Sequence, residues 1–320
     1  LSDLAADWYS DRMLGNFFML TCPYLYDRGD LAYFGLLRHL HSNEAVFPIL
    51  DTAQVFLDVY RHRERLYLRP NKVQQRYSPT MHMLHVWGDG VFEPVTESYT
   101  ITEILAPSAA ASEIGANPPR DLWSRTFLEA EEALRRDEVP EALFDRLLRM
   151  VVSRDDRVLA LARRYLSTAD LLEIGRRTIG TGLVGGKSVG MLLSRAILRA
   201  SDPMWNDRLE MHDSFYIASD VFYSFLVRNV CWWARRQQRD PMFFLAGAEQ
   251  VRRRIITGTF MEESEAQFAA MLDYFGQSPI IVRSSSLLED NFGNSFAGKY
   301  ESVFCANQGS SRQRLEDFKS

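Results

Sequence analysis

The sequence contains few cysteines. Its 320 residues include three of them, Cys22, Cys231 and Cys305, which lie far apart along the chain. An odd number of widely spaced cysteines does not fit a disulfide framework or a cysteine-rich zinc site. Free thiols are typical of proteins in reducing compartments, so we expect a cytoplasmic protein.

Long apolar runs and an excess of positive charge are missing too. No apolar stretch reaches the about 18 residues of a spanning helix and the N-terminus lacks a signal-peptide pattern, so we expect no membrane partner. The formal net charge is −5, which gives no basic field for nucleic acid. Because position 1 is Leu and the last residues follow a helical pattern, we expect part of a longer protein. Its oligomeric state stays open.

The metalloprotease motif H-E-x-x-H is also missing, and we expect no nucleophile elbow of a serine hydrolase. His82 and His85 would point to opposite faces of a strand. His39 and His41 lie in a stretch that we expect to be helical, where they would not share a face. We therefore expect structural or surface histidines and no metal site among them.

The chain length predicts two domains. Ser167 and Asp170 form a helix-capping pattern, and we place the boundary beside them, between residues 1–170 and 171–320. For the first domain we expect a mixed, mainly helical fold with a small β-hairpin and a role that the sequence does not reveal. The spacing of Val55, Val59, His62 and Leu66 predicts a helix around 53–68. The other expected elements are a hairpin turning at Asp89 and Gly90, a linker at 106–120, and helices at 123–134, 143–151 and 158–166.

The second domain shows strand and helix patterns in alternation, so the fold class is α+β with an α/β lobe at the end. The expected elements are a helix over 187–200, a short strand at 214–219, a helix capped by Ser219 or Asp220, a helix over 265–276 and a buried strand at 279–285.

A glycine-rich stretch opens this domain. It reads GTGLVGGKSVG from Gly180 to Gly190, close to the P-loop pattern G-x-x-x-x-G-K-[ST], but Thr181 stands where the first glycine belongs. Paired glycines let a backbone approach a phosphate, and a helix beginning at Lys187 would direct its free N–H groups there. An incomplete P-loop, another phosphate site and an ordinary glycine turn all stay open.

A second polar stretch follows much later, PIIVRSSSLLEDNFGNSFAGKYESVF from Pro279 to Phe304. Its apolar strand ends in Arg283 and serines, which places hydrogen-bond donors at the end of a strand where α/β sheets bind ligands. Arginine is suited to bidentate phosphate contacts.

These two stretches together resemble one family. "GGK" opening a helix, followed in order by "VRSS", "ED" and "SFAG", is similar to the N-terminal nucleotide-binding domain of phosphoenolpyruvate synthase and pyruvate phosphate dikinase, over about Ile174 to Ala306. The resemblance implies a partial, truncated ATP-grasp lobe. It implies that ATP is contacted by Lys187, Arg283, Gly298 and Ser302, with no catalytic residue in this chain.

Departures from the family pattern qualify this hypothesis. Ser286, Leu287 and Leu288 follow "RSS" where relatives commonly have Ala-Thr-Ala, and Lys299 replaces a Gln. The phosphohistidine signature Gly-Gly-x-Thr-Ser-His is missing, and we expect the Mg²⁺ ligands beyond residue 320. This stretch alone is therefore expected to be inactive.

The leading hypothesis is the N-terminal portion of an ATP-dependent phosphotransferase. Its phosphoryl acceptor would be a histidine on another domain, with pyruvate or phosphoenolpyruvate reached through that missing part. The alternatives are a nucleotide-sensing regulatory or interaction protein with a degenerate lobe, and a glucan or antibiotic dikinase of the same superfamily. A true P-loop enzyme is disfavoured, because it leaves the VRSS stretch unexplained.

Overall fold

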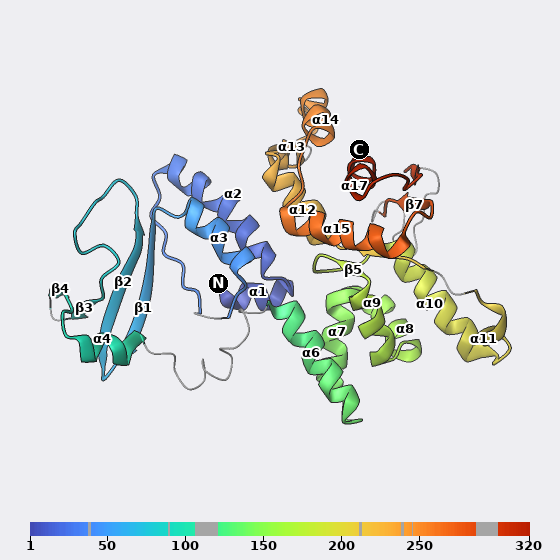
Figure 1. The fold of residues 1–320 in the computed structure, drawn as a ribbon, viewed down its shortest axis with the longest axis horizontal. Coiled ribbons are helices and arrows are strands. Elements are labelled where there is room, and N and C mark those ends of the chain that lie inside the picture. The colour runs from blue at the N-terminus through green and yellow to red at the C-terminus, as the bar shows by residue number, and fades with distance from the viewer. Residues whose placement is uncertain are drawn as a thin grey trace. The chain divides into compact units, whose positions relative to one another are not determined.

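The computed structural model describes residues 1–37, 40–88, 90–105, 121–210, 213–237, 240–244, 246–285 and 300–320. They form two compact units: residues 1–4 with 14–121, and residues 5–13 with 122–320 (Figure 1). The boundary predicted near residue 170 stays a prediction. None of the helices in the described ranges is long and apolar enough to span a membrane.

A four-stranded antiparallel sheet organises the first unit (Figure 1). Its order is β1 (Val55–His62), β2 (Arg65–Val73), β3 (His85–Gly88) and β4 (Val91–Pro94). In the register, Val59 lies opposite Leu68, which in turn lies opposite His85. The helices are α1 (Ser2–Trp8), whose first residues belong here, α2 (Arg12–Arg28), α3 (Asn43–Thr52) and α4 (Ser98–Leu105). Ile104 of α4 packs with Tyr67 and Leu84 in a small core.

The helix expected around 53–68 is wrong, because this stretch is the β1–β2 hairpin. Exposed and half-buried residues alternate along β1, which is the period of a strand with one covered face. Arg63 and Glu64 connect the strands and both have positive φ, 48° and 64°. Such a two-residue turn matches the twist of a hairpin. The spacing of Val55, Val59, His62 and Leu66 therefore coincided with a helical period by chance.

The helix expected around His39 and His41 is wrong as well. Residues 31–37 have no regular secondary structure, and His39 lies outside the described residues. His41 is buried, and its Nε2 lies 2.8 Å from the Ser2 hydroxyl. The hairpin predicted to turn at Asp89 and Gly90 is confirmed as β3–β4, although Asp89 is not among the described residues. The linker expected at 106–120 also lies outside them.

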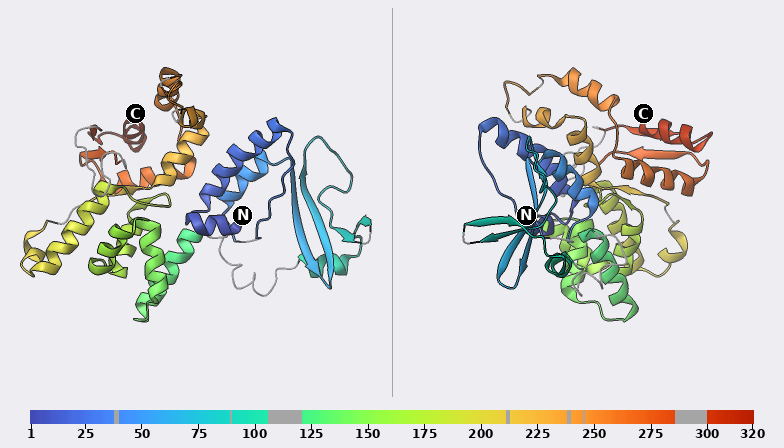
Figure 2. Two further views of the ribbon diagram at one scale, coloured as in Figure 1. Left: turned by 180° about the vertical axis from the view of Figure 1, so that it is seen from behind. Right: turned by 60° about the vertical axis from the view of Figure 1, so that its left-hand side comes forward.

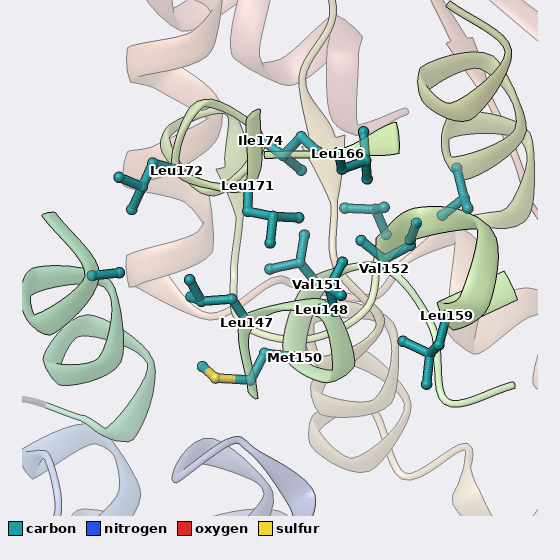
Figure 3. Packing of buried hydrophobic residues seen from close by; sticks show 14 of the residues in the cluster. Leu147, Leu148, Met150, Val151, Val152, Leu159, Leu166, Leu171, Leu172 and Ile174 are labelled. Carbon is teal, nitrogen blue, oxygen red and sulfur yellow. The ribbon is translucent and has the colours of Figure 1, made fainter. Parts of the chain in front are cut away.

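A helical core anchors the second unit. It is formed by α6 (Leu122–Arg135), α7 (Glu141–Val151), α8 (Asp156–Tyr165), α9 (Thr168–Arg176) and α10 (Gly186–Ser201). Figure 3 shows Leu147, Leu148 and Val151 of α7 close to Leu171 and Ile174 of α9. Their apolar positions recur with helical spacing, so each helix buries one stripe. The predicted helices at 123–134, 143–151 and 158–166 are confirmed.

Two short sheets lie in the rest of this unit. β5 (Thr178–Ile179) pairs in parallel with β6 (Tyr216–Ile217), and β7 (Ile280–Arg283) pairs antiparallel with β9 (Ser302–Cys305). The remaining helices are α11 (Trp205–Arg208), α12 (Ser219–Arg228), α13 (Trp232–Gln237), α14 (Ala248–Ile256), α15 (Glu262–Phe275) and α17 (Ser311–Lys319). Figure 2 shows α15 and α17 beside the β7–β9 pair. Phe268 of α15 centres the core between them.

The predicted α+β class is confirmed, and so are most elements of the second unit. Ser167 forms a capping box with Asp170. The cap expected at Ser219 or Asp220 is wrong: the N-cap of α12 is Ala218, and both polar residues lie inside the helix. β7 is not a buried strand, since its residues alternate between half-buried and exposed. A two-stranded sheet packs only one face here, so the other face keeps its contact with solvent.

The helical core gives a direct stability prediction. Leu147 is fully buried, so Leu147→Ala should lower the free energy of unfolding by about 2–5 kcal/mol, through lost burial and a residual cavity. Leu128→Ala on α6 removes a side chain that is 41% exposed and should cost under about 1 kcal/mol. Urea unfolding followed by circular dichroism measures both. Equal losses would contradict this position of the core.

Candidate nucleotide site

The glycine loop at 180–186 connects β5 to α10. Gly180 and Gly182 have φ angles of +84° and +128°, in the region that side chains other than glycine rarely adopt. A Cβ atom on Gly180 would also lie 2.5 Å from Oδ1 of Asp220. The Gly180 N–H donates a hydrogen bond to Oε1 of Gln267 on α15, at 2.9 Å. The loop is therefore held by the second unit's own helices.

Thr181 faces the protein interior. It is buried, and its hydroxyl donates to Oδ2 of Asp220 at 2.9 Å. The same hydroxyl lies 2.7 Å from the Ser10 hydroxyl. A P-loop would need glycine at this position so that the backbone could wrap around a phosphate. Thr181 is a structural anchor of the loop, which agrees with setting the P-loop reading aside.

The start of α10 presents backbone donors. Its N-cap is Gly185, which has no side chain to accept from the first turn. The Lys187 N–H instead donates to the Ser285 hydroxyl at 3.3 Å, and the Lys187 ammonium donates to the Ser284 carbonyl at 3.0 Å. The N-terminus of a helix of this length carries a partial positive charge that favours an anion.

Gly185 and Ser285 make the closest approach between the two predicted stretches. A Cβ atom on Gly185 would lie 2.3 Å from Cβ of Ser285, which no side chain can tolerate. Glycine is therefore required at 185 for the strand end after β7 to reach the helix start. Two stretches that are far apart in the sequence meet at this point.

The structure brings three of the four expected ATP contacts into one neighbourhood. Lys187 bonds to Ser284, the residue after Arg283, and Arg283 pairs with Ser302 across the β7–β9 ladder. Arg283 and Ser302 are exposed, and Lys187 is half-buried. Gly298 lies outside the described residues, together with Ser286, Leu287, Leu288 and Lys299. The ATP contacts themselves stay a prediction.

Asp220 was missed as a site component. The sequence offered it only as a possible helix cap, whereas its carboxylate is 2% exposed and accepts from Thr181. Arg12 Nη1 lies 3.5 Å from the same carboxylate, and Arg12 also pairs with Glu263. Burial raises the pKa of Asp220, an effect that the Arg12 charge opposes. No local pattern signals this residue, because its partners come from distant segments.

Metal ligands and histidines contribute little to this neighbourhood. Within the described ranges, no group of three His, Cys, Asp or Glu side chains could hold a metal ion. Glu289 and Asp290, the acidic pair of the second stretch, are not among the described residues. His85 is buried in the first unit and stacks on Phe92 with ring centroids 4.6 Å apart. That is the setting of a structural histidine.

A comparison with known protein families gives a match over the last part of the chain. Residues 181–320 match the family model described as the AMP/ATP-binding domain of pyruvate phosphate dikinase. The match begins within the glycine loop and includes α10, β7 and β9, so it supports the resemblance carried by the GGK and VRSS stretches. Comparisons with curated proteins and with solved structures give no match.

The raised pKa of Asp220 predicts a pH effect on stability. A carboxyl whose folded-state pKa lies above its unfolded value of 3.8 favours folding while it is protonated, and this contribution is lost as pH rises through the folded pKa. The free energy of unfolding of the wild type minus that of Asp220→Asn should therefore fall as the pH rises above about 4. Urea titrations across this range measure the difference.

Asp207→Asn is the matched control, because Asp207 is an exposed carboxyl of the same unit. It shows what the loss of one exposed carboxylate does to the free energy of unfolding at each pH. A wild-type advantage over Asp220→Asn that grows with pH would show that the ion pair with Arg12 dominates over burial.

Proposed function

We propose that the chain binds ATP where α10 begins, because residues 181–320 match the family model described as the AMP/ATP-binding domain of pyruvate phosphate dikinase. The phosphates would lie against the Gly185–Lys187 backbone, between Lys187 and Arg283. The observation that carries this proposal is the contact of Gly185 and Lys187 with Ser284 and Ser285, which joins the two stretches at one helix N-terminus.

The chemistry of these groups suits a polyphosphate. Backbone N–H groups at a helix start donate to phosphate oxygens, the Lys187 ammonium has three donors, and Arg283 can offer a planar pair. In phosphoryl transfer, positioning and charge neutralisation supply most of the catalysis. The residues of this chain would bind and orient the nucleotide. The acceptor would be a histidine of another domain, as the family resemblance implies.

Magnesium does not enter this proposal as a bound partner of the described residues. No group of three His, Cys, Asp or Glu side chains among these residues could hold a metal ion, and no step is assigned to the ion here. Lys187 and Arg283 would supply the positive charges beside the phosphates.

A nucleotide-sensing role is the second candidate. It is favoured by the present contacts of Lys187, whose N–H and ammonium both bond to the Ser284–Ser285 segment. A sensor would use nucleotide binding to replace these contacts without transferring phosphate. ATP-dependent formation of phosphohistidine in the full-length protein distinguishes the two: its presence supports the phosphotransferase, and ATP binding without it supports the sensor.

Removal of either cation should weaken ATP binding in the full-length protein. Lys187→Ala or Arg283→Ala deletes one charge-assisted contact, so we expect the Kd for ATP to rise about 10- to 100-fold. Formation of phosphohistidine should fall with it. Isothermal titration calorimetry and an acid-labile phosphate assay measure the two effects.

Lys319→Ala and Arg312→Ala are the matched controls in the same unit. Lys319 pairs with Glu265 and Arg312 with Glu316, on a helix outside the glycine loop. Both variants should bind ATP like the wild type. Wild-type affinity in Lys187→Ala and in Arg283→Ala would remove these residues from the site.

A further inference from the structure

A segment near the N-terminus belongs to the compact unit of the nucleotide site. Residues 5–13 pack with residues 122–320, although the family match begins only at residue 181. Ala5, Ser10 and Asp11 are buried there, and Tyr9 packs against the helical core. The segment therefore adds side chains to this unit from outside the matched domain.

A defined turn fixes the course of this segment. Helix α1 ends with the Ser10 N–H donating to the Ala5 carbonyl and the Tyr9 N–H donating to the Ala6 carbonyl, the pattern of a Schellman motif. Tyr9 takes the left-handed position of that motif with φ +56°, where glycine is usual. Arg154 holds the turn by donating to the Trp8 carbonyl at 3.0 Å and by lying 5.6 Å from the Tyr9 ring centroid. A bulky residue keeps this conformation only where its surroundings impose it.

The turn places Ser10 in contact with Thr181 of the glycine loop and Arg12 in contact with Asp220. Because the single hydroxyl proton of Thr181 is donated to Asp220, the Ser10 hydroxyl is the donor in its 2.7 Å contact with Thr181. Arg12 then pairs with Asp220 of α12 and with Glu263 of α15. These contacts join the N-terminal segment to Thr181 through polar groups, of which Ser10, Thr181 and Asp220 are buried and Arg12 is half-buried. In such networks each member fixes the orientation of the next.

We propose that Ser10 and Arg12 are positioning residues of the nucleotide site. Ser10 orients the Thr181 hydroxyl, and Arg12 holds the Asp220 carboxylate that accepts the hydrogen bond of this hydroxyl. Together they fix the conformation of the glycine loop and thereby the position of the start of α10. Neither residue needs to touch the nucleotide. This inference rests on the proposed function, and it extends the site to a segment that precedes the matched domain.

The test compares loop order and ATP affinity in the full-length protein. In Arg12→Leu, amide hydrogen exchange in peptides covering residues 180–187 should accelerate about tenfold without ATP, and the Kd for ATP should rise about tenfold. Arg12→Lys retains the charge and should restore most of both losses. Ser10→Ala removes one hydroxyl without unpairing a charge, so it should fold and should show both effects at about threefold. It carries the test even if Arg12→Leu fails to fold.

Arg314→Leu is the control for a purely structural effect. Arg314 is a buried arginine of this unit, and it donates to the carbonyls of Leu272 and Gly276 and pairs with Asp273. Its loss should destabilise α17 while exchange in 180–187 stays at the wild-type rate. Wild-type loop exchange and wild-type ATP affinity in both Ser10→Ala and Arg12→Leu would overturn the inference. A wild-type protein that binds no ATP would instead overturn the proposed function, and it would do so without any variant.

Discussion

The hydrogen bond from Thr181 to the buried Asp220 carboxylate holds the glycine loop on which the proposed nucleotide site depends. It ties the glycine loop to α12, and α12 in turn follows β6, the parallel partner of the strand that enters the loop. A buried carboxylate is costly unless it is hydrogen-bonded and paired. Thr181 and Arg12 offset part of this cost, while burial still raises the pKa of Asp220.

The sequence predicted the helices of the second unit well, because their apolar stripes are regular and their ends carry local signals. The capping box at Ser167 is such a signal, and it was confirmed. The β1–β2 hairpin shows the limit of this reasoning. Its apolar residues fit a helical period as well as a strand period. The chain turns at Arg63 and Glu64, two residues without a strong preference for positive φ, so the sequence does not reveal the hairpin.

The nucleotide contacts stay a prediction, but the residues with a recognisable local pattern are brought together in the structure. Gly185 and Lys187 form a recognisable stretch, and the structure brings them to Ser284 and Ser285. Ser10, Arg12 and Asp220 could not be identified in this way. Each of them has an ordinary sequence environment. Their association depends on contacts between residues more than a hundred positions apart in the sequence, such as Ser10 and Thr181. Only tertiary structure shows such a group.

The contact of Ser285 with the start of α10 also bears on how a phosphate would enter. Gly185 leaves the first turn of α10 without a side-chain cap, and the Ser285 hydroxyl accepts from Lys187 in its place. A hydroxyl is a neutral acceptor, whereas a phosphate oxygen carries charge and forms hydrogen bonds about twice as strong. On the proposed function, the nucleotide would therefore compete well for this N–H, and the hydroxyl could then turn and donate to the same phosphate. A serine at this position keeps the helix start satisfied without closing it to an anion.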